Sequence, residues 1–254
     1  CKIWPGPALP AKVKETSLSD RIGFDMTILS TLCSSLRYGA RRAKLNVTAA
    51  VFCLLATNSG IFAQEPPQIV AFGDSLTQGY GLIQGEGLVP QLTAWLDKNG
   101  VQATILNAGV SGDTTAGGLE RIDWTLTPDV SAVIIILGGN DLLRGLAPKD
   151  TKANLEGIIA KVLAKGLPVL LVPLAAPGNY GPAYQNAFDA IFPSLAQSYN
   201  ISLATPLLAP LLEHGLAAAL KNYMQSDAVH PNPAGVQKVV AALGPQVAAW
   251  LTKL

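Results

Sequence analysis

Cysteine is absent from most of this 254-residue chain. Its three cysteines, Cys1, Cys33 and Cys53, all precede residue 64. A folded body that starts near residue 64 therefore contains no disulfide, no thiolate metal site and no cysteine nucleophile. Histidine is also scarce, because His214 and His230 are the only two in the chain.

An excess of positive charge is also missing from the larger part of the chain. Residues 64–254 hold ten Lys/Arg against fourteen Asp/Glu, a balance of −4, whereas residues 1–63 hold eight against three, a balance of +5. A mildly acidic body without a basic patch makes nucleic acid an unexpected partner.

The apolar run from Val47 to Leu55 is too short to form a membrane-spanning helix. Basic residues precede it, and Ile61-Phe62-Ala63 before Gln64 is typical of a signal-peptide cleavage site. This pattern predicts a cleavable signal peptide and therefore a periplasmic or secreted protein. The basic residues are Arg37, Arg41, Arg42 and Lys44.

Three regions follow from this interpretation. Residues 1–25 are expected to be an unstructured extension or translated upstream sequence, residues 26–63 the signal peptide, and residues 64–254 a single domain. The alternative for residues 26–63 is an N-terminal helix that packs on the domain.

After Gln64, short apolar runs alternate with longer amphipathic stretches. Runs such as Val133–Leu137 are apolar on both faces, which suits a strand covered by helices on both sides. The pattern predicts an α/β fold, a three-layer α/β/α sandwich around a mainly five-stranded parallel sheet. The expected strands are 68–72, 103–106, 132–137, 169–173 and a weaker 201–204, and the expected helices are 88–98, 117–126, 151–165, 183–199 and 233–251.

Polar residues follow the first three expected strands. Ser75 comes after the first strand, Asn107–Thr114 after the second, and Gly138–Asp141 after the third. Because parallel strands end at one edge of the sheet, these segments are expected to meet there. Asp227–His230, which precedes the last helix, would have to reach the same edge.

These residues predict nucleophilic catalysis. Ser75 would be the nucleophile, His230 its general base, and Asp227 the carboxylate that orients the imidazole. The backbone N–H groups of Ser75 and Gly112 and the side-chain amide of Asn140 would hold the oxyanion.

Each residue has a plainer explanation when it is taken alone. Ser75 and Asp227 could be turn or capping residues, Gly112 a loop glycine with positive φ, and Asn140 a turn former. A lone histidine is more often structural, and His214 is interpreted in that way. Asp74 and Asp113 are expected to hold loops by hydrogen bonds. Neither G-x-G-x-x-G nor G-x-S-x-G is present, which disfavours a dinucleotide fold and an α/β-hydrolase elbow.

Taken together, four ordered blocks resemble those of the SGNH (GDSL-type) hydrolases. Within that superfamily the chain is most similar to the bacterial periplasmic arylesterases and the multifunctional acyl-CoA thioesterase I/lysophospholipase group. The resemblance implies a three-layer α/β/α fold, a Ser-Asp-His triad, no metal or cofactor, and hydrolysis of acyl esters or thioesters. The chain departs from the pattern at Ala175-Ala176-Pro177, where a more polar stretch is expected, so the acyl or leaving-group preference stays open. The blocks are Gly73-Asp74-Ser75-Leu76, Ser111-Gly112-Asp113-Thr114, Gly138-Gly139-Asn140-Asp141 and Asp227-x-x-His230.

A small-molecule acyl ester or thioester is the expected partner, and the protein is expected to be a monomer or weak oligomer without a stable membrane span. The apolar loop after Asn140 could line an acyl groove or simply pack its leucines on a helix. A carbohydrate or small-molecule O-acetylesterase is the rival activity, and a noncatalytic binding module is the rival class. The expected substrate-binding residues are Asp74, Leu142, Leu143, Leu146, Asn179 and Tyr180.

Overall fold

The computed structural model describes residues 65–254, and the predicted signal peptide and N-terminal extension lie outside this range. Five parallel strands form one sheet in the order β2-β1-β3-β4-β5. The predicted fold class and the number of strands are confirmed. The strands are β1 (Gln68–Gly73), β2 (Thr104–Gly109), β3 (Val130–Ile136), β4 (Val169–Leu171) and β5 (Ser202–Leu203).

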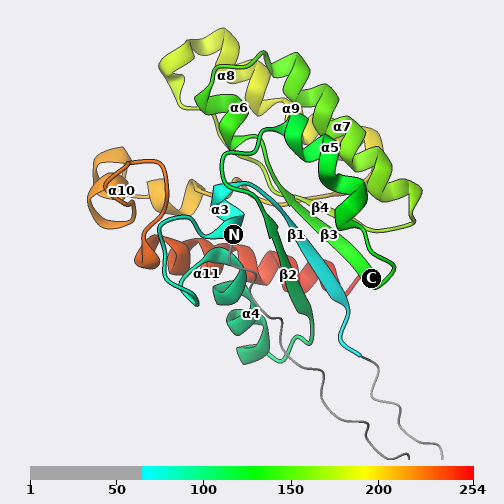
Figure 1. The fold of residues 1–254 in the computed structure, drawn as a ribbon. Helices are drawn as coiled ribbons and strands as arrows, with labels where there is room; N and C mark the ends of the chain where they lie inside the picture. Colours follow the sequence, from blue (N-terminus) through cyan, green and yellow to red (C-terminus); the bar gives the residue numbers. More distant parts are fainter. Residues whose placement is uncertain (1–64) are drawn as a thin grey trace, which may run out of the picture. The chain divides into compact units, whose positions relative to one another are not determined.

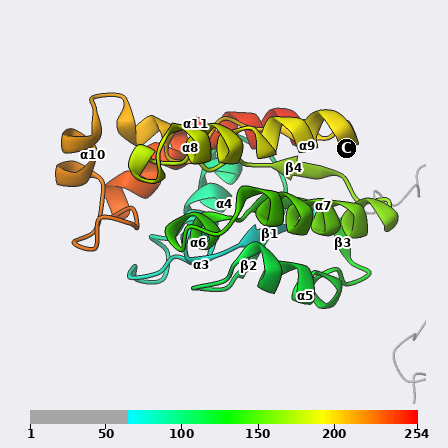
Figure 2. The same cartoon turned by 90° about the horizontal axis from the view of Figure 1, so that it is seen from above.

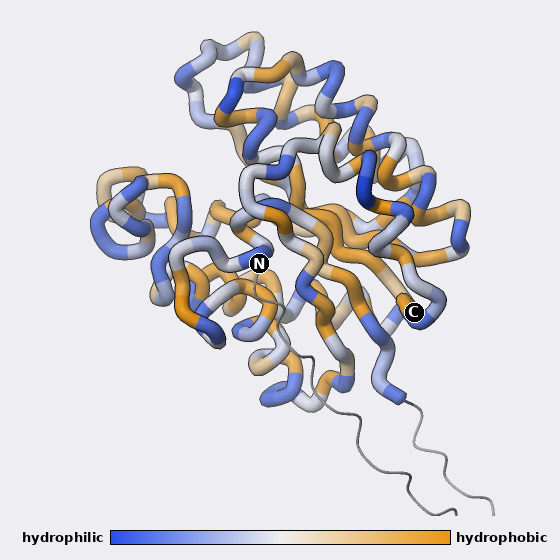
Figure 3. Tube along the Cα trace, viewed as in Figure 1, coloured by the Kyte–Doolittle hydropathy of each residue, from blue (hydrophilic) through white to orange (hydrophobic). Residues whose placement is uncertain are grey.

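The two central strands are buried on both faces because their sequences are almost entirely apolar. Five consecutive residues of β1 and five of β3 are buried. Figure 3 shows this as a hydrophobic centre of the sheet. Helices α4 (Leu88–Lys98) and α11 (Pro233–Leu251) pack together on one face, while α5 (Thr115–Thr125), α7 (Pro148–Ala164) and α9 (Ile191–Tyr199) lie on the other (Figures 1 and 2).

Local sequence explains where the main helices begin and which face they bury. The helix α4 buries Leu88, Leu92 and Leu96, which recur at a spacing of four residues. The helix α7 begins with Pro148, a residue whose missing N–H costs nothing in the first turn. The remaining elements are α3 (Ser75–Gln78), α6 (Gly139–Leu143), α8 (Pro182–Asp189), α10 (Leu216–Asn222) and the 3-10 turns η2 (Gly178–Tyr180) and η3 (Ala209–Leu212).

The prediction of one helix over 183–199 was wrong, because the helix is interrupted at Ala190. This residue ends α8 and caps the start of α9. Pro193 lies three residues further on, within the first turn of α9. Proline cannot donate to the carbonyl four residues earlier and its ring crowds that carbonyl, so a continuous helix could not pass this point unbent.

The order of the strands determines where a site can form. The chain leaves β1 for β2 on one side and then crosses to β3 on the other side of β1. Open α/β sheets bind ligands at such a reversal, outside the carboxyl ends of the strands. The short helix α3, which begins with Ser75, follows β1, and α6, which contains Asn140, follows β3 (Figure 1), so both residues lie at this point. Within residues 65–254, no helix is both long enough and apolar enough to cross a membrane.

Candidate active site

Ser75 lies at a sharp transition from strand to helix. It is the first residue of α3 and is 8% exposed. Asp74 caps this helix, with its Oδ1 atom accepting a hydrogen bond of 3.0 Å from the Leu76 N–H. A side chain at Gly73 would collide with Thr77 Oγ1 and the Ile136 carbonyl oxygen, so the turn is possible only with glycine there.

His230 and Asp227 meet Ser75 at the carboxyl edge of the sheet. The His230 Nε2 atom lies 2.8 Å from Ser75 Oγ, and its Nδ1 atom lies 2.6 Å from Asp227 Oδ2. The other carboxylate oxygen of Asp227 accepts hydrogen bonds from the N–H groups of Val229, at 2.9 Å, and His230, at 3.0 Å. This chain of contacts is the one that a serine nucleophile, an imidazole base and an orienting carboxylate require.

The loop that carries His230 is held by its own backbone. Ala228 adopts a φ of 58°, which is unusual for a residue with a side chain. Its N–H donates to the Gln225 carbonyl at 3.0 Å, and the Gln225 N–H donates to the His230 carbonyl at 2.8 Å. The Tyr80 ring lies against the imidazole, with 4.8 Å between the ring centroids.

Two carboxyl groups beside Ser75 have opposite pKa shifts. Burial raises the pKa of Asp74 to about 6, against the lowering effect of hydrogen bonds from the Leu76 and Gly139 N–H groups and of the nearby His230. Burial also acts to raise the pKa of Asp227, but the N–H bonds and the His230 ring outweigh it and lower that pKa to about 2. Asp227 therefore carries its negative charge at any pH well above 2, as an orienting carboxylate should.

Gly112 and Asn140 are positioned by the loop that follows β2. The Asn140 Nδ2 atom donates to the Asp113 carbonyl at 2.9 Å, which engages one of its two hydrogens. Gly112 has a φ of 82°, and its carbonyl accepts a hydrogen bond of 2.8 Å from Arg144. The second hydrogen of the amide and the Gly112 N–H are the groups predicted to hold an oxyanion.

A buried carboxylate anchors the helix that begins at Gly139. Asp141 is 1% exposed and accepts hydrogen bonds from both the N–H, at 2.8 Å, and the hydroxyl of Thr115. Thr151 and Asn154 of α7 complete this network, with Asn154 donating to the Thr115 hydroxyl at 3.1 Å. The network ties the first turns of α5, α6 and α7 together behind Asn140.

A cavity of about 380 Å³ opens beside Ser75. Its polar lining residues are Asp74, Ser75 and Asn140, and the rest of its wall is apolar. This volume is within the range of roughly 300–1,000 Å³ that is typical of small-molecule sites. The apolar wall consists of Leu76, Gly139, Leu142, Leu143, Leu174, Ala175, Ala176, Pro177, Pro206, Leu208, Ala209, Leu211, Leu212, Leu216, Ala219, Leu220, Met224, Ala228 and Val229.

The predicted substrate-binding residues fall into two groups. Asp74, Leu142 and Leu143 line the cavity, whereas Leu146, Asn179 and Tyr180 do not. Tyr180 instead donates from its hydroxyl to the Leu143 carbonyl at 3.1 Å, which braces the loop after Asn140. Asn179 lies beside it in η2.

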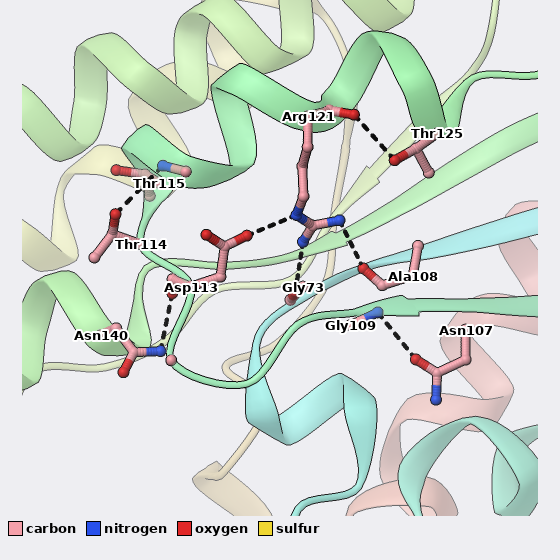
Figure 4. A network of polar contacts seen from close by, with 12 residues as sticks. Gly73, Asn107, Ala108, Gly109, Asp113, Thr114, Thr115, Arg121, Thr125 and Asn140 are labelled. Atoms are coloured by element: carbon pink, nitrogen blue, oxygen red, sulfur yellow. Dashed lines mark hydrogen bonds and ion pairs between the residues drawn. The ribbon is translucent and has the colours of Figure 1, made fainter. Parts of the chain in front are cut away.

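Some residues lie outside the cavity, and others were not predicted to contribute to the site. His214 is exposed and is not among the residues that line the cavity. The cavity wall formed by residues 206–224 and the polar contacts of Arg121, drawn in Figure 4, were not predicted from the sequence. The segment Ala175-Ala176-Pro177, which departs from the family pattern, lies in the apolar wall.

Residues 65–254 contain no group of three or more His, Cys, Asp or Glu side chains arranged to hold a metal ion.

Comparison with known proteins agrees with this geometry. The model of the GDSL-like Lipase/Acylhydrolase family matches residues 71–238. The chain belongs to this family. The match spans the segments that carry Ser75, Gly112, Asn140, Asp227 and His230.

Three esterases are similar to this chain over most of their own length. Esterase TesA of Pseudomonas aeruginosa is 34% identical over 178 residues, which cover 70% of this chain and 86% of the relative. The solved structure of AlinE4, an esterase of the SGNH-hydrolase family, is 43% identical, with a TM-score of 0.60 and coverage of 74% and 97%. The psychrotrophic esterase EstA from Pseudoalteromonas sp., solved in a form inhibited by monoethylphosphonate, is 30% identical, with a TM-score of 0.67 and coverage of 73% and 98%. The predicted family and the predicted ester-hydrolase class of enzyme are confirmed.

Proposed function

We propose that this protein is an exported serine hydrolase that cleaves carboxylic esters through an acyl-enzyme. The contact of His230 with both Ser75 Oγ and Asp227 carries this proposal. In the first step, His230 takes the proton from the Ser75 hydroxyl while the serine oxygen attacks the acyl carbonyl. The same imidazole then donates that proton to the leaving alcohol. Asp227, still ionised, stabilises the imidazolium in between.

The oxyanion of the tetrahedral intermediate would be held by three donors. These are the backbone N–H groups of Ser75 and Gly112 and the free hydrogen of the Asn140 amide. Water activated by His230 then hydrolyses the acyl-enzyme by the reverse sequence of proton transfers, which releases the acid and restores Ser75. Thioesters undergo the same attack, so they are included among the proposed substrates.

The apolar cavity beside Ser75 would take the acyl chain. An acetyl group would leave most of its volume unused, whereas each buried CH₂ of a longer chain stabilises the bound state by about 0.8 kcal/mol. The apolar residues at 175–177, which line this cavity, support the same preference. We therefore favour medium-chain esters over the O-acetylesterase alternative.

The decisive experiment is the change Ser75→Ala together with active-site labelling. Loss of a triad nucleophile lowers turnover by about 10⁶-fold, so p-nitrophenyl ester hydrolysis should disappear while circular dichroism stays native. A fluorophosphonate probe should label the wild type and not the variant. Hydrolysis within tenfold of wild type in Ser75→Ala would contradict the proposal, and a wild type that the probe fails to label would favour a binding module.

Export is a separate part of the proposal, and it is supported by the charge and apolar pattern of residues 26–63. Expression of the whole chain in a bacterial host should give periplasmic protein whose N-terminus lies near Gln64. N-terminal sequencing of the active protein checks this. Active soluble protein that retains residues 27–63 would contradict cleavage.

A further inference from the structure

The guanidinium of Arg121 lies at the carboxyl ends of the two strands that lead into the site (Figure 4). It projects from α5 and uses each of its three nitrogens. Nε contacts Asp113 Oδ2 at 2.7 Å, Nη1 donates to the Ala108 carbonyl at 3.0 Å, and Nη2 donates to the Gly73 carbonyl at 2.8 Å. Its flat face covers the Phe72 ring, with 4.0 Å from Cζ to the ring centroid. One side chain thus joins the end of β1, the end of β2 and the loop after β2.

The ion pair between Arg121 and Asp113 is largely withdrawn from solvent. The side chains of Arg121 and Asp113 are 23% and 11% exposed. A Cβ atom at Gly117 would collide with Asp113 Oδ1, so the glycine leaves space for the carboxylate. Lysine could not reproduce the arrangement, because an ammonium group lacks the planar fork and the flat face that arginine presents.

Asp113 connects this guanidinium to the proposed oxyanion donors. Its carboxylate binds Arg121, its carbonyl accepts the Asn140 Nδ2 hydrogen at 2.9 Å, and it directly follows Gly112. The Gly73 carbonyl that Arg121 also binds lies two residues before Ser75. Any shift of the guanidinium would therefore be passed on to the Gly112 loop, the Asn140 amide and the nucleophile turn.

We propose that Arg121 is a positioning residue that aims the Gly112 N–H and the Asn140 amide at the oxyanion formed on Ser75. This inference rests on the proposed serine-hydrolase function. Neither Arg121 nor Asp113 lines the acyl cavity, so substrate binding does not depend on them directly. Their effect is expected in the chemical step, where the oxyanion donors act.

The test combines Arg121→Met with Asn140→Ala in a double-mutant cycle. Complete loss of an oxyanion donor costs about 10²- to 10³-fold in kcat. A misaligned pair of donors should cost about 10- to 100-fold, with KM for p-nitrophenyl esters within threefold of wild type. In the Asn140→Ala background, Arg121→Met should cost markedly less than it does in the wild type, because part of what it positions is already absent.

A surface ion pair offers the matched control. Lys161 of α7 also reaches α5, where it contacts Asp123 at 2.8 Å and the Leu119 carbonyl at 3.2 Å, but it touches no residue of the site. Lys161→Met removes a cation of the same kind and should leave kcat within twofold. All assays are run at least 10 °C below the Tm of each variant, so that loss of folded protein does not enter the rates.

Several results would overturn the inference. A kcat for Arg121→Met within fivefold of wild type would do so, and so would a loss that is fully additive with Asn140→Ala. If Arg121→Met does not fold, Arg121→Lys, which keeps the charge and loses the fork, is judged by the same two criteria. Failure of the serine-hydrolase proposal is recognised separately, by activity that persists in Ser75→Ala.

Discussion

The buried carboxyl group of Asp74 should make the stability of this protein depend on pH in an unusual direction. Its pKa is raised from the ordinary 3.8 to about 6, chiefly by burial, and the residue is 1% exposed. The folded protein therefore holds the Asp74 proton more tightly than the unfolded chain does. The corresponding stabilisation is fully present below pH 3.8 and is lost as the pH rises to about 6.

The change Asp74→Asn isolates this contribution because asparagine stays neutral at every pH. A pKa difference of about two corresponds to about 3 kcal/mol at roughly 1.4 kcal/mol per pH unit. The difference in unfolding free energy, variant minus wild type, should accordingly rise by up to about 3 kcal/mol between pH 4 and pH 7. Asparagine supplies one acceptor where the carboxylate supplies two for the Leu76 and Gly139 N–H groups, which adds a constant offset that does not depend on pH.

Urea denaturation at four or five pH values measures this slope. Ser75→Ala is the control, since it removes the neighbouring hydroxyl and keeps the carboxyl, and its difference from wild type should stay flat. If the Asp74→Asn difference also stayed constant within about 0.5 kcal/mol over this range, burial would not dominate the ionisation of Asp74 and the argument would fail.

Three further outcomes are expected. Asp227→Asn should lower kcat by up to about 10⁴-fold, as for a triad carboxylate, without blocking binding of the fluorophosphonate probe at Ser75. Near-normal turnover of this variant at pH values from 5 to 8 would count against the orienting role of Asp227. Leu143→Ala should flatten the rise of kcat/KM from acetyl to octanoyl esters, because this side chain lines the cavity, whereas Leu146→Ala, outside the lining, should leave the slope unchanged. If Leu143→Ala and Leu146→Ala changed this slope equally, the loop would not contact the acyl chain through Leu143. Thr115→Val should reduce the unfolding free energy by about 1–3 kcal/mol, since it removes a hydroxyl donor from a buried carboxylate, and a urea midpoint equal to wild type would refute this.

The sheet could be predicted because each of its central strands is a short, continuous apolar run in the sequence. The run at 133–137 is apolar on both faces, and only a parallel sheet covered on both sides suits it. The catalytic candidates could be predicted because each is adjacent to a strand end or to the last helix. The break at Ala190 was missed because the apolar spacing of residues 183–199 continues across it, and Pro193 was the available signal.

Two parts of the site had no comparable signal. The contacts of Arg121 go to backbone carbonyls 13 and 48 residues away, which no local motif encodes. The cavity wall at residues 206–224 combines a 3-10 turn and a short helix, and the four-residue spacing of Leu208, Leu212, Leu216 and Leu220 indicates a helix face without indicating what that face lines. These positions acquire a role through long-range packing alone, so only the folded structure could indicate them.

Much of the cavity wall comes from a different part of the chain than the proposed reacting groups. Substrate selection and bond cleavage therefore depend largely on different residues. The proposed nucleophile and oxyanion groups follow crowded strand ends, where Gly73 and Gly139 leave no space for a side chain, and the proposed base and its carboxylate lie on the loop before α11. Residues 206–220 contribute much of the apolar lining and none of those groups, whereas Tyr223 and Met224 hold the loop of His230 by backbone contacts. Changing the side chains or the length of residues 206–220 would change the size and shape of the molecule that the cavity admits and would leave the proposed acid–base and oxyanion groups in place. Substrate range can therefore change in this protein, by mutation or by design, along residues 206–220, which supply lining and no reacting group.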